Sequence, residues 1–95
     1  MTVELAGNAS YNVGQDDDTV VVAGFRFLEA NVKNGQVKKM LDAGITHYSV
    51  SLNTAQGGVW VLIESLGRKP SGGLNLRWDA HSKSIVEMVA WGSVK

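Results

Sequence analysis

The segment with the residues best suited to bind an anion runs from Gly67 to Gly73 and combines glycines with two cations. Glycine amides can approach an anion closely, and a neighbouring arginine and lysine add positive charge. The segment matches neither Gly-x-x-x-x-Gly-Lys-Ser/Thr nor Gly-x-Gly-x-x-Gly, so a solvated hairpin connection is the competing interpretation. The candidate ligand-binding residues are Arg68, Lys69, Ser71, Gly72 and Gly73.

The two histidines, His47 and His81, are the side chains that would most readily serve in catalysis or zinc binding. Neither lies in a motif that pairs it with a nucleophile or with further metal ligands. The chain has no cysteine, which excludes a thiolate nucleophile, a zinc–thiolate site and a disulfide framework. The sequence therefore predicts a protein that is not an enzyme and that uses no catalytic residue, metal or cofactor.

The acidic run from Asp16 to Asp18 has two interpretations. A calcium loop would need alternating oxygen ligands and a closing glutamate about a dozen residues on, where Glu29 stands. The valines between them supply no side-chain ligands. We therefore interpret Asp18 as the N-cap of a helix, with its acidic neighbours near the positive end of the helix dipole.

Charge and hydropathy limit the classes of partner. The 95 residues include nine lysines and arginines and nine aspartates and glutamates, so the formal net charge is zero. A neutral chain has no overall field to attract nucleic acid or anionic lipid. The longest apolar run, from Val59 to Ile63, is far shorter than the roughly 20 residues that cross a bilayer. With no basic and apolar leader at the N-terminus, the sequence predicts a cytoplasmic protein.

The positions of apolar residues predict one α+β domain over residues 1–95. Short β segments are expected at 2–6 and 10–13, followed by one or two helices at about 18–43. Phe25, Leu28 and Val32 have helical spacing, Asn34 and Gly35 interrupt the pattern, and Gly44 is expected to cap the end. Three consecutive valines and a glycine weaken the first helix, so a strand over 20–27 is the alternative.

A four-stranded antiparallel sheet is expected at about 45–92. Residues 46–52 alternate between apolar and polar side chains, which indicates a strand with one wet face. Residues 59–66 are apolar on both alternate sets, which is typical of a central strand covered on both sides. The chain's own helices or another molecule could supply that cover.

The last two strands allow a prediction of register. A turn over 80–84 would place Arg77 opposite Glu87, Leu76 opposite Met88, Trp78 opposite Val86 and Asp79 opposite Ile85, which matches like chemistry on both faces. The side chains then expected to face the core are Leu74, Leu76, Trp78, Val86, Met88 and Ala90. The opposite side has the composition of an interface, formed by Arg77, Ile85, Glu87, Val89 and Trp91.

These features favour a small non-enzymatic protein-interaction module that self-associates as a homodimer or small oligomer through the sheet face or edge. An accessory or inhibitor role, as in a phage or mobile element, would suit its size and composition. A small-ligand or nucleotide-binding protein using the segment from Gly67 to Gly73 is one alternative. A single-stranded nucleic-acid binder that stacks bases on exposed aromatic side chains is another, and the zero net charge disfavours it.

Overall fold

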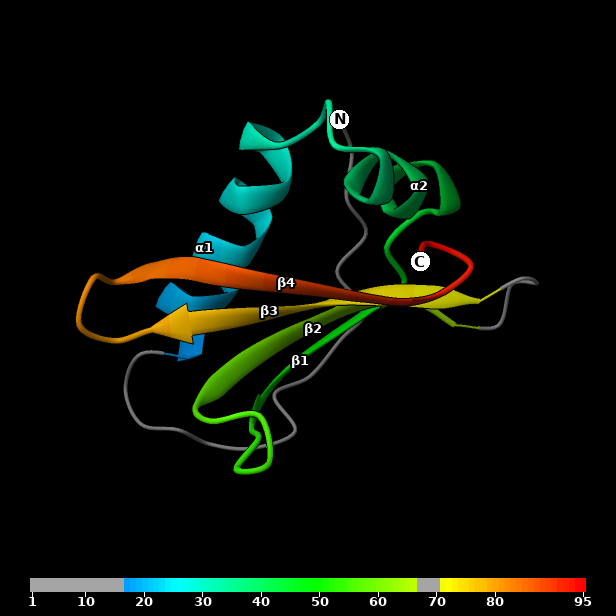
Figure 1. The fold of residues 1–95 in the computed structure, drawn as a ribbon. Coiled ribbons are helices and arrows are strands. Elements are labelled where there is room, and N and C mark those ends of the chain that lie inside the picture. The colour runs from blue at the N-terminus through cyan, green and yellow to red at the C-terminus, as the bar shows by residue number, and fades with distance from the viewer. Residues whose placement is uncertain (1–16, 67–70) are drawn as a thin grey trace.

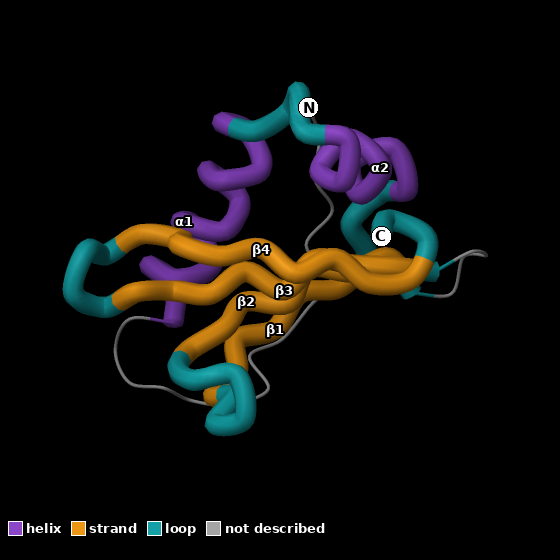
Figure 2. Tube along the Cα trace, in the orientation of Figure 1, coloured by secondary structure: helices purple, strands orange, loops and turns teal. Residues whose placement is uncertain are grey.

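The computed structural model describes residues 17–66 and 71–95, which form two helices followed by a four-stranded antiparallel sheet. The α+β class expected from the sequence is confirmed, and the β segments expected at 2–6 and 10–13 lie outside the described residues. The strands are ordered β1-β2-β3-β4, so each pairs with its neighbour in the sequence (Figure 2). The elements are α1 (Asp17–Ala30), α2 (Gly35–Ala43), β1 (His47–Leu52), β2 (Val59–Ser65), β3 (Gly72–Asp79) and β4 (Ser84–Gly92).

Helix α1 contains the whole of residues 20–27, so the alternative of a strand there is wrong. Asp17 is already helical, which means that Asp18 is not the N-cap that the sequence predicted. Carboxylates are favourable throughout the first turn, because the positive end of the helix dipole extends over it, and acidic composition alone cannot place the cap residue. The calcium-loop alternative is also excluded, since Asp18 to Glu29 is continuous helix.

Helix α2 has a cap at each end, at the positions that the sequence predicted as its boundaries. The side-chain oxygen of Asn34 accepts hydrogen bonds from the amides of Gln36 at 2.9 Å and Val37 at 3.2 Å. Gly44 ends the helix with a φ of 83°, a conformation that glycine adopts without strain. Neither helix within residues 17–66 and 71–95 is long and apolar enough to cross a membrane.

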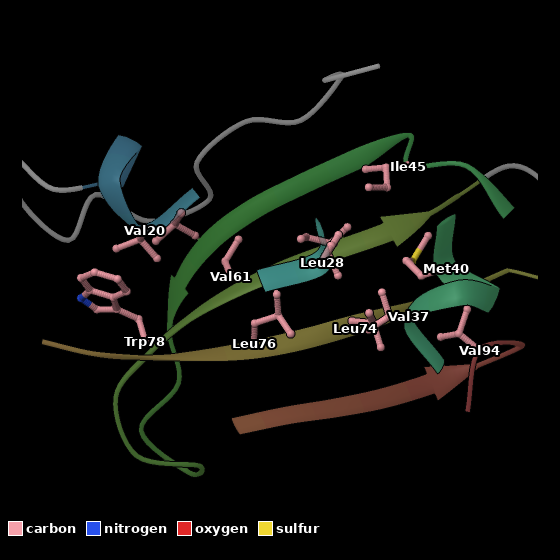
Figure 3. Close-up of a cluster of buried hydrophobic side chains, with 12 residues drawn as sticks. Val20, Leu28, Val37, Met40, Ile45, Val61, Leu74, Leu76, Trp78 and Val94 are labelled. Atoms are coloured by element: carbon pink, nitrogen blue, oxygen red, sulfur yellow. The ribbon is translucent and has the colours of Figure 1, made fainter. Parts of the chain in front are cut away.

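Both helices pack on the same side of the sheet and enclose the hydrophobic core against it (Figure 1). Helix α1 contributes Val20 and Leu28, and α2 contributes Val37 and Met40. Val94 folds back beside α2 and is fully buried, so the end of the described chain closes the core (Figure 3). The sheet residues of the cluster are Val50, Val61, Ile63, Leu74, Leu76 and Trp78.

The register of β3 and β4 follows the prediction over most of its length and then shifts. Leu76 lies opposite Met88 and Arg77 opposite Glu87, as expected. A β-bulge follows, and beyond it Trp78 pairs with Ile85 and not with Val86, and Asp79 pairs with Ser84 and not with Ile85. The pairing expected for Val86 and its place in the core are therefore wrong, because the bulge leaves Val86 46% exposed. Ile85 packs against the core in its place.

Candidate interaction surface

Three cross-strand rows of side chains form the face of the sheet turned away from α1 and α2, which we call the distal face. Successive residues of a strand point to opposite faces, so this face takes the residues between the core positions. The pairing of the four strands brings these residues into line across the sheet. The first row is His47, Glu64, Gly73 and Trp91; the second is Ser49, Leu62, Asn75 and Val89; the third is Ser51, Trp60, Arg77 and Glu87.

In the first row the indole of Trp91 lies across Gly73. A Cβ atom placed on Gly73 would be 2.7 Å from Nε1 of Trp91 and 2.7 Å from the carbonyl oxygen of Ile63. Only a residue without a side chain fits there, and the aromatic ring covers the backbone that glycine leaves bare. Trp91 is therefore partly buried by its own sheet and presents its remaining surface on the distal face.

Glu64 and His47 face each other at the other end of this row. Partial burial raises the pKa of the Glu64 carboxyl, and the positive charge of His47 opposes that shift by lowering it. The raised pKa means that burial outweighs the attraction of the histidine. This end of the distal face therefore carries a charge that depends on pH.

The third row contains an ion pair, in which Nε of Arg77 donates to Oε1 of Glu87 at 3.0 Å. The two side chains are 33% and 48% exposed, so solvent screens them and the pair contributes at most about 1 kcal/mol to stability. The pair places one charge of each sign beside the edge of the sheet. A partner surface with the opposite arrangement could pair with both.

Trp60 lies in the same row and is only 2% exposed, although it is not part of the core cluster on the helix side. Its indole nitrogen is buried and has no hydrogen-bond acceptor within the described part of the chain. An unpaired buried donor costs about 1 to 3 kcal/mol. The apolar residues on both alternate sets of β2 are the sequence feature that indicates a covered side chain here, and Trp60 is not among the predicted interface residues.

Four of the five residues predicted to form the interface come together on the distal face: Arg77, Glu87, Val89 and Trp91. The fifth, Ile85, lies on the helix side, and this part of the prediction is wrong. The reason is the bulge, which reverses the facing of the strand between Glu87 and Ile85. Val86 is the apolar side chain that the bulge exposes at this edge in its place.

The candidate anion-binding segment is described only in part, because Arg68 and Lys69 lie outside the described residues. Gly72 and Gly73 are buried residues at the start of β3, and the carbonyl oxygen of Ser71 accepts a hydrogen bond from the Ser93 amide at 3.0 Å. A Cβ atom on Gly72 would lie 2.7 Å from the Ser93 amide nitrogen. Both glycines therefore allow close packing of the chain, and an anion site at this segment stays a prediction.

The histidines lie on separate elements, His47 in β1 and His81 in the turn between β3 and β4. Nδ1 of His47 is 3.0 Å from the hydroxyl of Thr46, and the amide of His81 donates to the Asp79 carboxylate at 3.3 Å. Within residues 17–66 and 71–95, no three side chains of His, Cys, Asp or Glu gather closely enough to hold a metal ion.

The chain matches no protein-family model, no curated protein and no solved structure. Its function therefore has to be inferred from the distal face and from the edge of the sheet beside it.

Proposed function

We propose that the protein is a non-enzymatic interaction module that self-associates through β4, in the cytoplasmic location expected from its sequence. The contact would combine the outer edge of β4 with the adjoining side chains of the distal face. The observation that carries this proposal is the edge itself: β4 ends the described sheet, and its five residues from Met88 to Gly92 hold no charge.

An edge strand offers unpaired backbone groups to any second strand that approaches it. Proteins that must stay monomeric commonly protect such edges with lysine, proline or an inward-pointing charge. Strand β4 has nine residues with neither lysine nor proline, and Glu87 is its one charged residue. Its bulge lies at one end only, between the pairs that Arg77 and Trp78 form. The stretch beyond Glu87 is therefore suited to strand addition.

Symmetry limits how two copies can meet at this edge. Two identical edges pair about a two-fold axis and run antiparallel. An axis at Glu87 would place two like charges opposite each other, which is destabilising. An axis at Val89 would instead set Glu87 of each copy opposite Trp91 of the other and pair the two valines. We therefore expect the axis at Val89, with a continuous sheet of eight strands.

Light scattering coupled to size-exclusion chromatography tests the proposal directly. At high micromolar concentration we expect a mass of twice that of the chain, falling toward the monomer mass on dilution. A monomer mass at the highest concentration reached would contradict the proposal.

Substitution of two equally exposed valines distinguishes disruption of pairing at the β4 edge from a general effect of added charge. Val86 at the bulge of β4 is 46% exposed, and Val32, after the end of α1, is 47% exposed. We expect Val86→Lys to shift the mass toward the monomer, because a lysine on an edge opposes strand addition. Val32→Lys should leave the mass unchanged. Equal effects of both substitutions would assign the contact to another surface.

A further inference from the structure

A groove runs along α1 on the side of the sheet opposite to the distal face. Its wall on one side is α1, and its other wall is the hairpin between β3 and β4. The cavity volume is about 610 Å³, within the range of about 300 to 1,000 Å³ that small-molecule sites occupy. Apolar side chains form most of the lining, chiefly Val22, Ala23, Phe27, Trp78 and Ile85. Trp78 stands at one end of the buried cluster, near Val20 (Figure 3).

The groove follows most of the length of α1. The α1 residues that line it extend from Asp18 to Ala30. At 1.5 Å per residue these span about 18 Å along the helix axis. A peptide helix is about 10 Å wide with its side chains, so most of a helix of that length would lie outside the groove. An extended acyl chain fits the length and the volume better.

Two cations border the apolar lining, Arg26 on α1 and Lys83 in the β3–β4 turn. Within the described part of the chain neither side chain forms an ion pair. Lys83 has a φ of 54°, a backbone conformation that residues other than glycine adopt at a cost. It lies beside Thr19 in a small adjoining hollow of about 170 Å³.

Among the described lining residues Asp18 is the single carboxylate, and it lies at the same end as Thr19 and so partly offsets the charge of Lys83. Arg26 stands eight residues further along α1, about 12 Å away along the axis. Among the described lining residues two cations therefore stand against one carboxylate, and Arg26 is separated from that carboxylate along α1. We propose that the groove binds a single-chain anionic amphiphile, with its carboxylate at Arg26 and its hydrocarbon chain along Phe27, Trp78 and Ile85.

Dodecanoate, used below the concentration at which it forms micelles, is the probe for this site. The chain contains three tryptophans, of which only Trp78 lines the groove. Labelled with fluorotryptophan, the protein should give three fluorine NMR signals, assigned by replacing each tryptophan with phenylalanine. We expect dodecanoate to shift the Trp78 signal saturably, with one molecule bound per chain, and to leave those of Trp60 and Trp91 in place.

Two comparison compounds test the two halves of the proposed chemistry. Butanoate keeps the carboxylate but lacks the chain, and dodecyltrimethylammonium keeps the chain but reverses the charge. Both should bind at least tenfold more weakly than dodecanoate, since each lacks one of the two interactions. Equal binding of the cation would overturn the proposed role of Arg26, and the absence of a saturable Trp78 shift would overturn the site.

Variants locate the site without disturbing the core. Arg26→Gln should weaken dodecanoate binding about tenfold, the effect of losing one charge-assisted hydrogen bond. Lys38→Gln removes the same charge from an exposed position on α2 and should leave the affinity unchanged. Val22→Trp, at a position 48% exposed on the groove wall, should block binding, whereas Val32→Trp should not. Full affinity in Val22→Trp, with an unchanged melting temperature, would place the ligand elsewhere.

Discussion

Gly24 of α1 lies so close to Val61 of β2 that a Cβ atom on the glycine would be 2.9 Å from Cγ1 of the valine. Ile63 and Leu76 lie 3.6 Å from the same position. The three neighbours are fully buried core residues and have little room to move. The glycine that weakens α1 as a helix is therefore the residue that allows α1 to approach the sheet.

We expect Gly24→Ala to lower the free energy of unfolding by about 1 kcal/mol. Alanine adds about 1 kcal/mol of helix propensity, but overpacking a core typically costs about 1 to 3 kcal/mol. Gly35→Ala is the matched control, because nothing lies within 4 Å of its Cβ position, and it should be neutral or stabilising. Urea denaturation measures both variants. Stabilisation by Gly24→Ala would show that the sheet yields to the methyl group.

The cap of α2 leads to a second prediction. The Asn34 side chain accepts hydrogen bonds from two amides that otherwise have no partner in the helix. We expect Asn34→Ala to lower the free energy of unfolding by about 1 kcal/mol and Asn34→Ser, which keeps an acceptor, to lower it much less. Hydrogen exchange at the Gln36 and Val37 amides would report the same loss locally. If Asn34→Ala were as stable as the unchanged protein, the cap would contribute nothing.

The sequence predicted the order of the elements because their signals are local. Helical spacing, the interruption at Asn34 and the capping glycine at position 44 each depend on a few neighbouring residues. The pairing of Arg77 with Glu87 could also be predicted, because a shift by one residue would have placed charges against apolar side chains. Where one register would pair charged with apolar side chains, the order of residue types along the two strands is enough to exclude it.

The bulge could not be predicted in the same way. Ile85 and Val86 are adjacent, and both are apolar and β-branched, so either could face the core without a chemical penalty. The choice depends on how the hairpin fits against α1, whose residues line one groove with Ile85 and Trp78. That fit is a tertiary property, and the groove itself has no signature in the sequence. The prediction therefore places Ile85 on the wrong face of the sheet.

Glu64 leads to a prediction about pH. Burial raises the pKa of its carboxyl, so the folded state holds the proton more tightly than the unfolded state. The stabilisation from protonated Glu64 is complete below the unfolded pKa and is lost as the pH rises through the folded pKa. Carbon NMR titration of the Glu64 carboxyl should give a pKa above the ordinary glutamate value.

His47 provides the control for this titration, because its positive charge lowers the Glu64 pKa. In His47→Gln the pKa of Glu64 should rise further than in the unchanged protein. A fall in that variant would show that His47 does not act through its charge.

The pKa of Asp79 is shifted in the opposite direction to that of Glu64, and the cause of the shift lies in the β3–β4 turn. The Ser82 hydroxyl donates to its carboxylate at 2.7 Å, and the amides of Ser82 and His81 donate at 3.2 Å and 3.3 Å. These bonds, with that of the Ser82 hydroxyl the strongest, lower the pKa of Asp79 below its usual value. The carboxylate therefore stabilises the fold at any pH above the unfolded pKa, and this stabilisation is lost as the pH falls through the folded pKa.

Ser82→Ala should raise the Asp79 pKa measured by NMR, whereas Ser51→Ala, on β1, should leave it unchanged. An Asp79 pKa at or above the ordinary aspartate value in the unchanged protein would contradict this account of the turn.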